Sequence, residues 1–283
     1  MENSLMLDKG CLELARRQFC LDVGLSWDEY CAQQKKKTYI CKSSPKMQNG
    51  ARVYAGRSNF FRAIVCLGQL FLCCDEKMYD WAIEQYAQGT PEWFCDYKKL
   101  RKLDEKLREF GYEIFDTHVY FLPEVCEEIV TVPRQEKCAD TSEYVWYEQD
   151  ELMQFQKTNR FTSAICFWEN TPDVLAVAAM REREAAQRTK SFDQNHMCGM
   201  AGASRDGEYL WQIGINVDED YTGQGLGHQL VRALKDEILR RGKVPFYGTS
   251  ESHIISQTVG LKAGFVPAWT EISVREIREN HHT

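Results

Sequence analysis

The chain has 283 residues, of which 43% are hydrophobic and 27% are charged, and its formal net charge is −7. This length and ordinary globular composition predict two domains of usual size rather than a single small one. The acidic balance argues against a nucleic-acid-binding protein, which usually carries a basic patch or a high pI.

The twelve cysteines and six histidines lack the short spacings that a metal site requires, and there is no CxxC pair. The first ten residues have neither the basic start nor the apolar centre of a signal peptide. The longest apolar run, at 63–74, is too short to span a bilayer. We therefore expect a cytoplasmic protein with reduced thiols, no metal, and no membrane or nucleic-acid partner.

The first part of the chain, residues 1–123, is predicted to form an α/β domain to which the sequence assigns no chemistry. Its expected elements, in chain order, are helices over the first 40 residues with a capped second start at Ser26, a strand-like core segment at 63–74, a helix capped by Asp75, a helix carrying Leu100, Leu103, Leu107 and Phe110 on one stripe and ending at Gly111, and a strand at 112–122. Residues 124–141 are polar and without periodicity, which is typical of a linker.

The second part, residues 142–283, also alternates between strand and helix patterns. Its expected elements, in chain order, are a helical stretch at 147–155, a strand at 173–180, a charged segment at 181–194, strands at 197–204 and 209–217 joined by a turn at 205–207, a helix at 225–241, a strand at 244–248, a helix at 252–263 and a strand at 268–274. Gly242 suits the position just after the long helix.

The most informative segment is residues 213–228, where a strand leads through an acidic turn into a glycine loop that opens a helix. The N–H groups of such a loop and of the first helical turn have no internal partners, and the helix dipole adds positive charge there. Glycines at 223, 225 and 227 would let a diphosphate approach the backbone closely. On the residues alone, a phosphate-binding loop and a purely structural turn remain equally good interpretations.

Two known phosphate-binding patterns fit poorly. A dinucleotide fold would place an acidic residue at the end of the next strand, whereas the strand at 244–248 ends in glycine. The phosphate loop of nucleotidases needs Gly-Lys-Ser/Thr, which is absent here.

The segment from Met200 to Trp269, about half the chain, resembles the core of the GNAT acyltransferases. Their coenzyme-A loop reads Gln/Arg-x-x-Gly-x-Gly/Ala, and residues 222–227 (TGQGLG) supply both required glycines, with Thr222 at the leading position. Their helix motif Asn-x-x-Ala-x-x-Leu-Tyr falls on residues 253–260 and is followed by Gly-Phe at 264–265. Runs at 211–215, 242–249 and 263–269 look like a bacterial GNAT group with a divergent N-terminal partner domain.

The resemblance implies a mixed α/β sheet flanked by helices, with the N-terminal domain as a possible degenerate copy of the same fold. It also implies acetyl-CoA as co-substrate and direct attack by an amine on the thioester. The implied coenzyme-A-binding residues are Ile215, Asn216, Val217, Thr222, Gly223, Gln224, Gly225, Leu226, Gly227 and His253. Backbone N–H groups of 215–217 would hold the oxyanion.

Two positions depart from the family pattern. His253 replaces the family's Asn, and Gly260 replaces the Tyr that acts in many members as general acid toward the leaving thiolate. A thiol with a pKa of about 8.5 is a tolerable leaving group without a strong acid, so the change affects the catalytic assignment more than coenzyme-A binding. Tyr247 or His253 could supply the missing proton, although core packing and a plain helix start explain them equally well.

Asp206 and Glu208 are the candidates for the base that deprotonates the amine, and solvated hairpin residues are the alternative interpretation. Trp211 and Gln212 are candidates for the acceptor pocket, with ordinary core packing as the alternative for Trp211. We expect an N-acetyltransferase for a small amine. A protein lysine or N-terminal acetyltransferase and a non-catalytic acyl-CoA sensor remain open.

Overall fold

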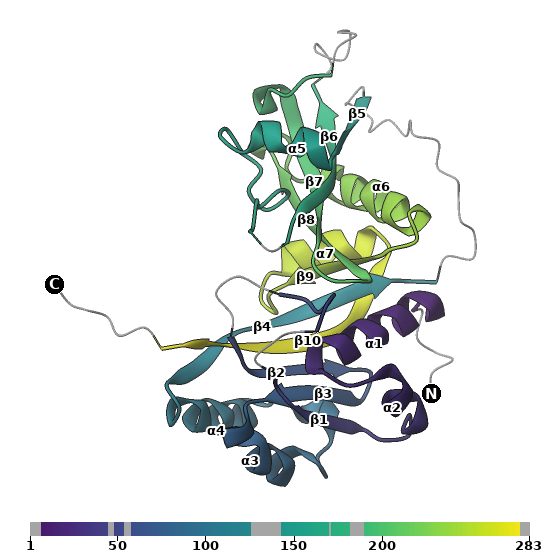
Figure 1. Cartoon of the computed structure of the whole chain (residues 1–283). Coiled ribbons are helices and arrows are strands. Elements are labelled where there is room, and N and C mark those ends of the chain that lie inside the picture. The colour runs from purple at the N-terminus through teal and green to yellow at the C-terminus, as the bar shows by residue number, and fades with distance from the viewer. Residues whose placement is uncertain are drawn as a thin grey trace, which may run out of the picture. The chain divides into compact units, whose positions relative to one another are not determined.

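The computed structural model describes residues 7–44, 48–53, 58–125, 143–169, 171–181 and 190–277. These residues form two compact units, each assembled from separate stretches of the chain (Figure 1). Unit 1 comprises Met1–Leu14, Phe121–Gly248 and His253–Val266. Unit 2 comprises Ala15–Tyr120, Thr249–Ser252 and Pro267–Thr283. Each unit contains both helices and strands, which confirms the predicted mixed α/β class.

Unit 2 contains a mixed sheet with the strand order β1-β3-β2-β10-β4. β1 pairs with β3 in parallel, whereas β2 is antiparallel to both β3 and β10. The elements with residues in this unit are α1 (Lys9–Val23), α2 (Trp27–Ala32), β1 (Thr38–Lys42), β2 (Ser58–Cys66), β3 (Gln69–Cys74), α3 (Glu76–Tyr86), η2 (Pro91–Trp93), α4 (Tyr97–Arg108), β4 (Tyr112–Pro123) and β10 (Phe265–Glu276).

The core of unit 2 follows from the apolar stripes of its helices. The buried residues Met78 and Ala82 of α3 and Leu103 and Leu107 of α4 pack in one cluster with side chains of β2, β3 and β10. The predicted caps are confirmed, because the Ser26 side chain accepts from a backbone N–H of α2 and the Asp75 side chain does so for α3.

The strand-like core predicted over residues 63–74 is present, and it is made of two strands. The segment belongs to two antiparallel strands, β2 and β3, which Leu67 and Gly68 join in a tight turn with φ values of 45° and 78°. Two central residues with positive φ are characteristic of a tight β-hairpin. The sequence hid this turn because both strands are buried on most positions and read as one apolar run.

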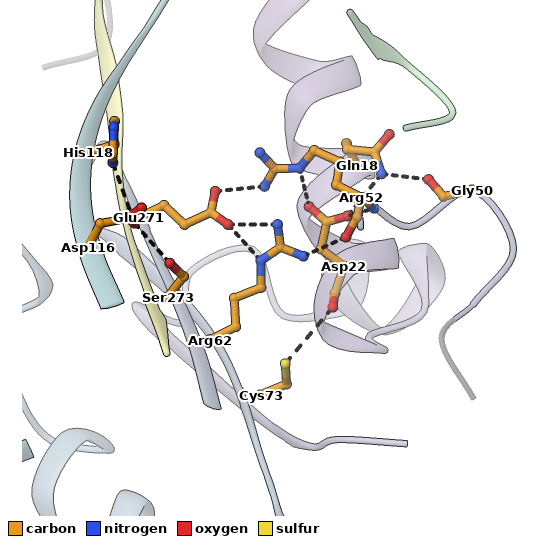
Figure 2. A network of polar contacts seen from close by, with 10 residues as sticks. All are labelled: Gln18, Asp22, Gly50, Arg52, Arg62, Cys73, Asp116, His118, Glu271 and Ser273. Carbon is orange, nitrogen blue, oxygen red and sulfur yellow. Dashed lines mark hydrogen bonds and ion pairs between the residues drawn. The ribbon is translucent and has the colours of Figure 1, made fainter. Parts of the chain in front are cut away.

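A charged network is buried in the interior of unit 2 (Figure 2). The carboxylate of Asp22 contacts the Arg52 Nε at 2.6 Å, and Arg52 Nη2 lies 3.0 Å from Glu271 Oε2, although poorly aligned for a hydrogen bond. Arg62 Nε donates to Glu271 Oε1 at 2.6 Å, and Gln18 adds a 3.0 Å hydrogen bond to Asp22. Two acids thus balance two guanidinium groups, as a buried ion network requires.

Unit 1 contains a second mixed sheet in which β9, β8, β7, β6 and β5 are successive neighbours. The strands from β5 to β8 are antiparallel, and β9 is parallel to β8. The elements with all or most of their residues in this unit are β5 (Glu143–Glu148), α5 (Gln149–Leu152), η3 (Met153–Phe155), β6 (Asp173–Met180), η4 (Gln194–His196), β7 (Met197–Arg205), β8 (Leu210–Val217), η5 (Glu219–Tyr221), α6 (Leu226–Arg240), β9 (Val244–Thr249) and α7 (Ile254–Lys262).

The predicted helical stretch at 147–155 is partly wrong. Residues 143–148 form β5, and helix begins only at Gln149, where Glu148 and Glu151 make a capping box. The aromatic and β-branched residues at 144–147 favour a strand, and pairing with the buried β6 stabilises it. Most of the predicted linker (126–141) and of the charged segment (182–189) lies outside the described residues. In the described parts of the chain, no helix is long and apolar enough to cross a membrane.

Candidate functional site

The site begins where two parallel strands part. β8 pairs with β9 only from Leu210 to Ile213, whose partner is Tyr247, while β8 continues beside β7 as far as Val217. The last four residues of β8 therefore have a strand on one side only. Their backbone groups on the other side face a gap that a ligand can enter.

The glycine loop opens α6 directly after β8 and η5. Gly223 and Gly225 have φ values of 81° and 88°. Residues that carry a side chain rarely adopt this left-handed backbone conformation. The first helical hydrogen bond runs from the Gln229 N–H to the Gly225 carbonyl, at 3.4 Å. The N–H groups of residues 226–228 thus precede the helical ladder and are available to an anion.

A cleft of about 530 Å³ lies between the free edge of β8, the glycine loop and α7. Nine of the ten predicted coenzyme-A-binding residues line it: Ile215, Asn216, Val217, Thr222, Gly223, Gly225, Leu226, Gly227 and His253. Gln224 is not among the lining residues, because its side-chain amide turns back to donate to the Asp220 carbonyl at 2.9 Å.

Further lining residues were not predicted from the sequence: Tyr221, His228, Ile255, Ser256, Thr258, Val259 and Lys262. Most of them lie on α7, which carries no motif of its own beyond the family spacing. Of these residues, only His228 could have been inferred from the sequence, because it directly follows the last glycine of the loop.

Tyr247 lies where β8 and β9 part, and it lines the cleft. Its ring packs over Gly260, since a Cβ at position 260 would lie 3.1 Å from Tyr247 Cδ1. Its hydroxyl is 2.7 Å from the Ser256 hydroxyl, and Ser256 also lines the cleft. Burial raises the pKa of Tyr247, so the phenol stays protonated well above neutral pH. Glycine at 260 thus leaves space that Tyr247 occupies.

Ser163 and Ala164 pack directly against β8 at Gly214 and Asn216. A Cβ at Gly214 would overlap the Ser163 carbonyl oxygen, so only glycine permits this close approach. The Asn216 side-chain oxygen accepts hydrogen bonds from the N–H groups of Ser163 and Ala164, at 2.7 and 3.0 Å. The segment is therefore fixed directly on the sheet beside the parting strands.

The two candidate bases differ in their surroundings. Asp206 is 6% exposed and accepts a 2.6 Å hydrogen bond from the Ser204 hydroxyl. Glu208 is exposed, and its backbone carbonyl accepts from Lys243 at 2.8 Å. Neither residue lines the cleft, and neither do Trp211 and Gln212, which are half-buried on β8 before the point where the strands part.

The acidic turn before the loop is structural. Asp218 Oδ2 contacts Arg160 at 3.1 Å and Arg181 at 3.4 Å, which neutralises the carboxylate. Its other oxygen caps the short helix η5 through the Asp220 N–H. Within the described ranges, no group of three or more His, Cys, Asp or Glu side chains is arranged to hold a metal ion.

Comparison with known proteins gives one family. The model of the acetyltransferase (GNAT) family matches residues 132–265, which include the glycine loop, β8, β9 and α7. No curated protein matches the sequence.

Solved structures resemble the chain weakly. A GCN5-related N-acetyltransferase-like protein from Streptococcus suis has 12% identity and a TM-score of 0.44, covering 94% of this chain and 99% of its own. GCN5-related N-acetyltransferases from Sphaerobacter thermophilus and Kribbella flavida have 12% identity and TM-scores of 0.41 and 0.39. They cover 77% and 82% of this chain, and 77% and 91% of their own. Because these TM-scores are low, the family assignment rests on the sequence match: residues 132–265 are a domain of the acetyltransferase (GNAT) family.

Proposed function

We propose that the protein is an N-acetyltransferase that moves the acetyl group of acetyl-CoA to the amine of a small molecule. The observation that carries the proposal is the cleft between the parted strands β8 and β9, which opens onto the glycine loop. The loop offers N–H groups to a diphosphate, and the gap offers backbone groups to an extended, amide-containing chain.

The residues present fit coenzyme A. A Cβ at Gly223 would meet nothing within 4 Å, so the loop backbone is open on that side. The walls of the cleft combine apolar side chains, such as Ile215, Val217 and Val259, with few charged groups. This combination suits a ligand that has one anionic end and a thioester at the other.

Acetyl-CoA, when bound, supplies an activated acyl group whose leaving group is a thiolate. The chain's own contribution begins at the free edge of β8, where backbone N–H groups of residues 215–217 would stabilise the carbonyl oxygen. Tyr247 would hold its hydroxyl proton ready for the sulfur, with Ser256 orienting the phenol.

The base would act from the other face of the sheet. Asp206 suits this role better than Glu208, because a buried carboxylate held by Ser204 has a fixed orientation whereas Glu208 is exposed. We expect the segment that packs on Gly214 and Asn216 to narrow the approach of the acceptor on this face. A narrow approach favours a small amine over a folded protein as acceptor.

The binding test uses two glycines with the same backbone constraint. Gly223 and Gly242 have φ values of 81° and 74°, and a Cβ on either would meet nothing within 4 Å. Each alanine variant should lose about 1–2 kcal/mol of stability from backbone strain. Only Gly223→Ala should weaken acetyl-CoA binding measured by titration calorimetry, because only Gly223 lines the cleft. Equal effects of both variants on binding would contradict the assigned site.

Turnover is tested separately with acetyl-CoA and a panel of primary amines, by following the release of free thiol. Thiol release that depends on an amine supports acyl transfer. Tight binding of acetyl-CoA without any amine-dependent release would instead favour the acyl-CoA sensor.

A further inference from the structure

Three basic side chains gather beside the glycine loop, and we call them the cation cluster: His228 and Arg232 of α6 and Lys262 of α7. His228 and Lys262 line the cleft. The His228 ring lies over the loop, since a Cβ at Gly225 would be 3.1 Å from its Cε1. Arg232 follows His228 by one helical turn and therefore lies on the same side of α6.

The charges of Lys262 and Arg232 act on the His228 imidazole. Partial burial lowers the pKa of His228, and the positive charges of Lys262 and then Arg232 lower it further. Lys262 and Arg232 therefore lie close enough to His228 for their positive charges to act on the imidazole.

Arg232 and Lys262 form no ion pair within 4.0 Å among the residues that the structure describes. Two other cations of unit 1, by contrast, are paired: Arg160 with Asp218, and Arg240 with Glu237. Neighbouring cations without acidic partners repel one another, and an anionic ligand relieves that repulsion.

The cluster extends beyond the anion site of the loop along α6. The loop N–H groups end at residue 228, and Arg232 lies four residues further along α6, a rise of about 6 Å. A single diphosphate held by the loop would thus leave the far end of the cluster unused. A ligand with a second phosphate, a few bonds away from the first, would use both.

We propose that the cation cluster of His228, Arg232 and Lys262 binds the 3′-phosphate of coenzyme A, so that the cleft selects the 3′-phosphorylated carrier over dephospho-CoA. The inference rests on the proposed function, because it assumes that coenzyme A occupies the cleft. A phosphomonoester carries between one and two negative charges at neutral pH, and it accepts charge-assisted hydrogen bonds from Arg and Lys.

The test compares the affinities of CoA and dephospho-CoA, measured by titration calorimetry, for the wild-type protein and for Arg232→Gln, Lys262→Gln and the double variant. Each lost charge-assisted contact should weaken CoA binding by about 10-fold or more. Dephospho-CoA binding should change less than twofold in the same variants. Lys157→Gln is the matched control, since Lys157 is exposed and lies outside the cleft lining, and it should change neither affinity.

The outcomes are distinct. Selective loss of CoA affinity, with dephospho-CoA affinity unchanged, supports the proposal. Equal loss for both ligands overturns it, since the cluster would then serve the diphosphate. Unchanged affinity for both ligands overturns it as well, because the cations would then be idle. If the wild-type protein binds neither ligand, the proposed function itself fails, and the inference fails with it.

Discussion

Replacing Glu271 by glutamine should destabilise unit 2 strongly. Glu271 is 1% exposed, and its two carboxylate oxygens face different guanidinium groups (Figure 2). Oε1 lies 2.6 Å from Arg62, and Oε2 lies 3.0 Å from Arg52. Glutamine keeps the shape of the side chain but removes the charge, and so removes one of the two buried acids that face Arg52 and Arg62.

The expected loss of stability in Glu271→Gln follows from the burial of the ion network. Breaking a buried ion pair by removing one partner costs about 3–5 kcal/mol, because the remaining charge is left uncompensated. The control is Glu76→Gln, the same chemical change in the same unit. Glu76 pairs with Lys42 at 2.7 Å, but the side chains are 80% and 50% exposed. An exposed pair of this kind contributes about 0–1 kcal/mol.

The assay is urea unfolding combined with hydrogen exchange of the β2 and β3 amides, which reports on unit 2 itself. Glu271→Gln should lower the free energy of opening of these strands by several kcal/mol, and Glu76→Gln by at most about 1 kcal/mol. Similar small losses in both variants would refute the view that the buried network holds β10 to β2.

Three further predictions concern unit 1. Gly214→Ala should cost about 1–3 kcal/mol in thermal unfolding, since its Cβ would overlap the Ser163 carbonyl; an unchanged melting temperature would contradict the close packing. Asn216→Ala should cost about 1–3 kcal/mol and speed hydrogen exchange at 163 and 164, because it removes the acceptor of both N–H groups; unchanged exchange would count against this clamp. Tyr247→Phe should lower kcat about 10- to 100-fold and leave KM nearly unchanged. Because burial raises the pKa of Tyr247, the wild-type rate should persist until the pH rises through that pKa, and a pH–rate profile identical in the variant would exclude the phenol as donor.

Much of the site could be predicted from the sequence because the information is local. The glycines at 223 and 225 need positive φ, and the structure places both in that conformation at the start of α6. The caps at Ser26 and Asp75 depend on contacts within three residues, and both are present. The nine predicted residues that line the cleft lie on β8, on the loop or at the start of α7.

Other features are decided only when distant segments meet. Arg62 and Glu271 are 209 residues apart, and neither residue's neighbours in the sequence indicate a buried ion pair. The turn at Leu67 and Gly68 cannot be recognised in the sequence, because the strands on both sides of it are buried and the apolar run continues across it. The domain limits of 1–123 and 142–283 stay predictions.

The sequence by itself therefore determined the glycine loop, the strand before it and the helix caps, since each depends on backbone preferences within a few residues. Tertiary structure decided that Tyr247 fills the space over Gly260 and bonds to Ser256, and that Lys262 joins His228 beside the loop. It also decided that residues 267–277 belong to unit 2. Such contacts depend on which strands and helices become neighbours, and burial across the whole fold, rather than any local pattern, sets that choice.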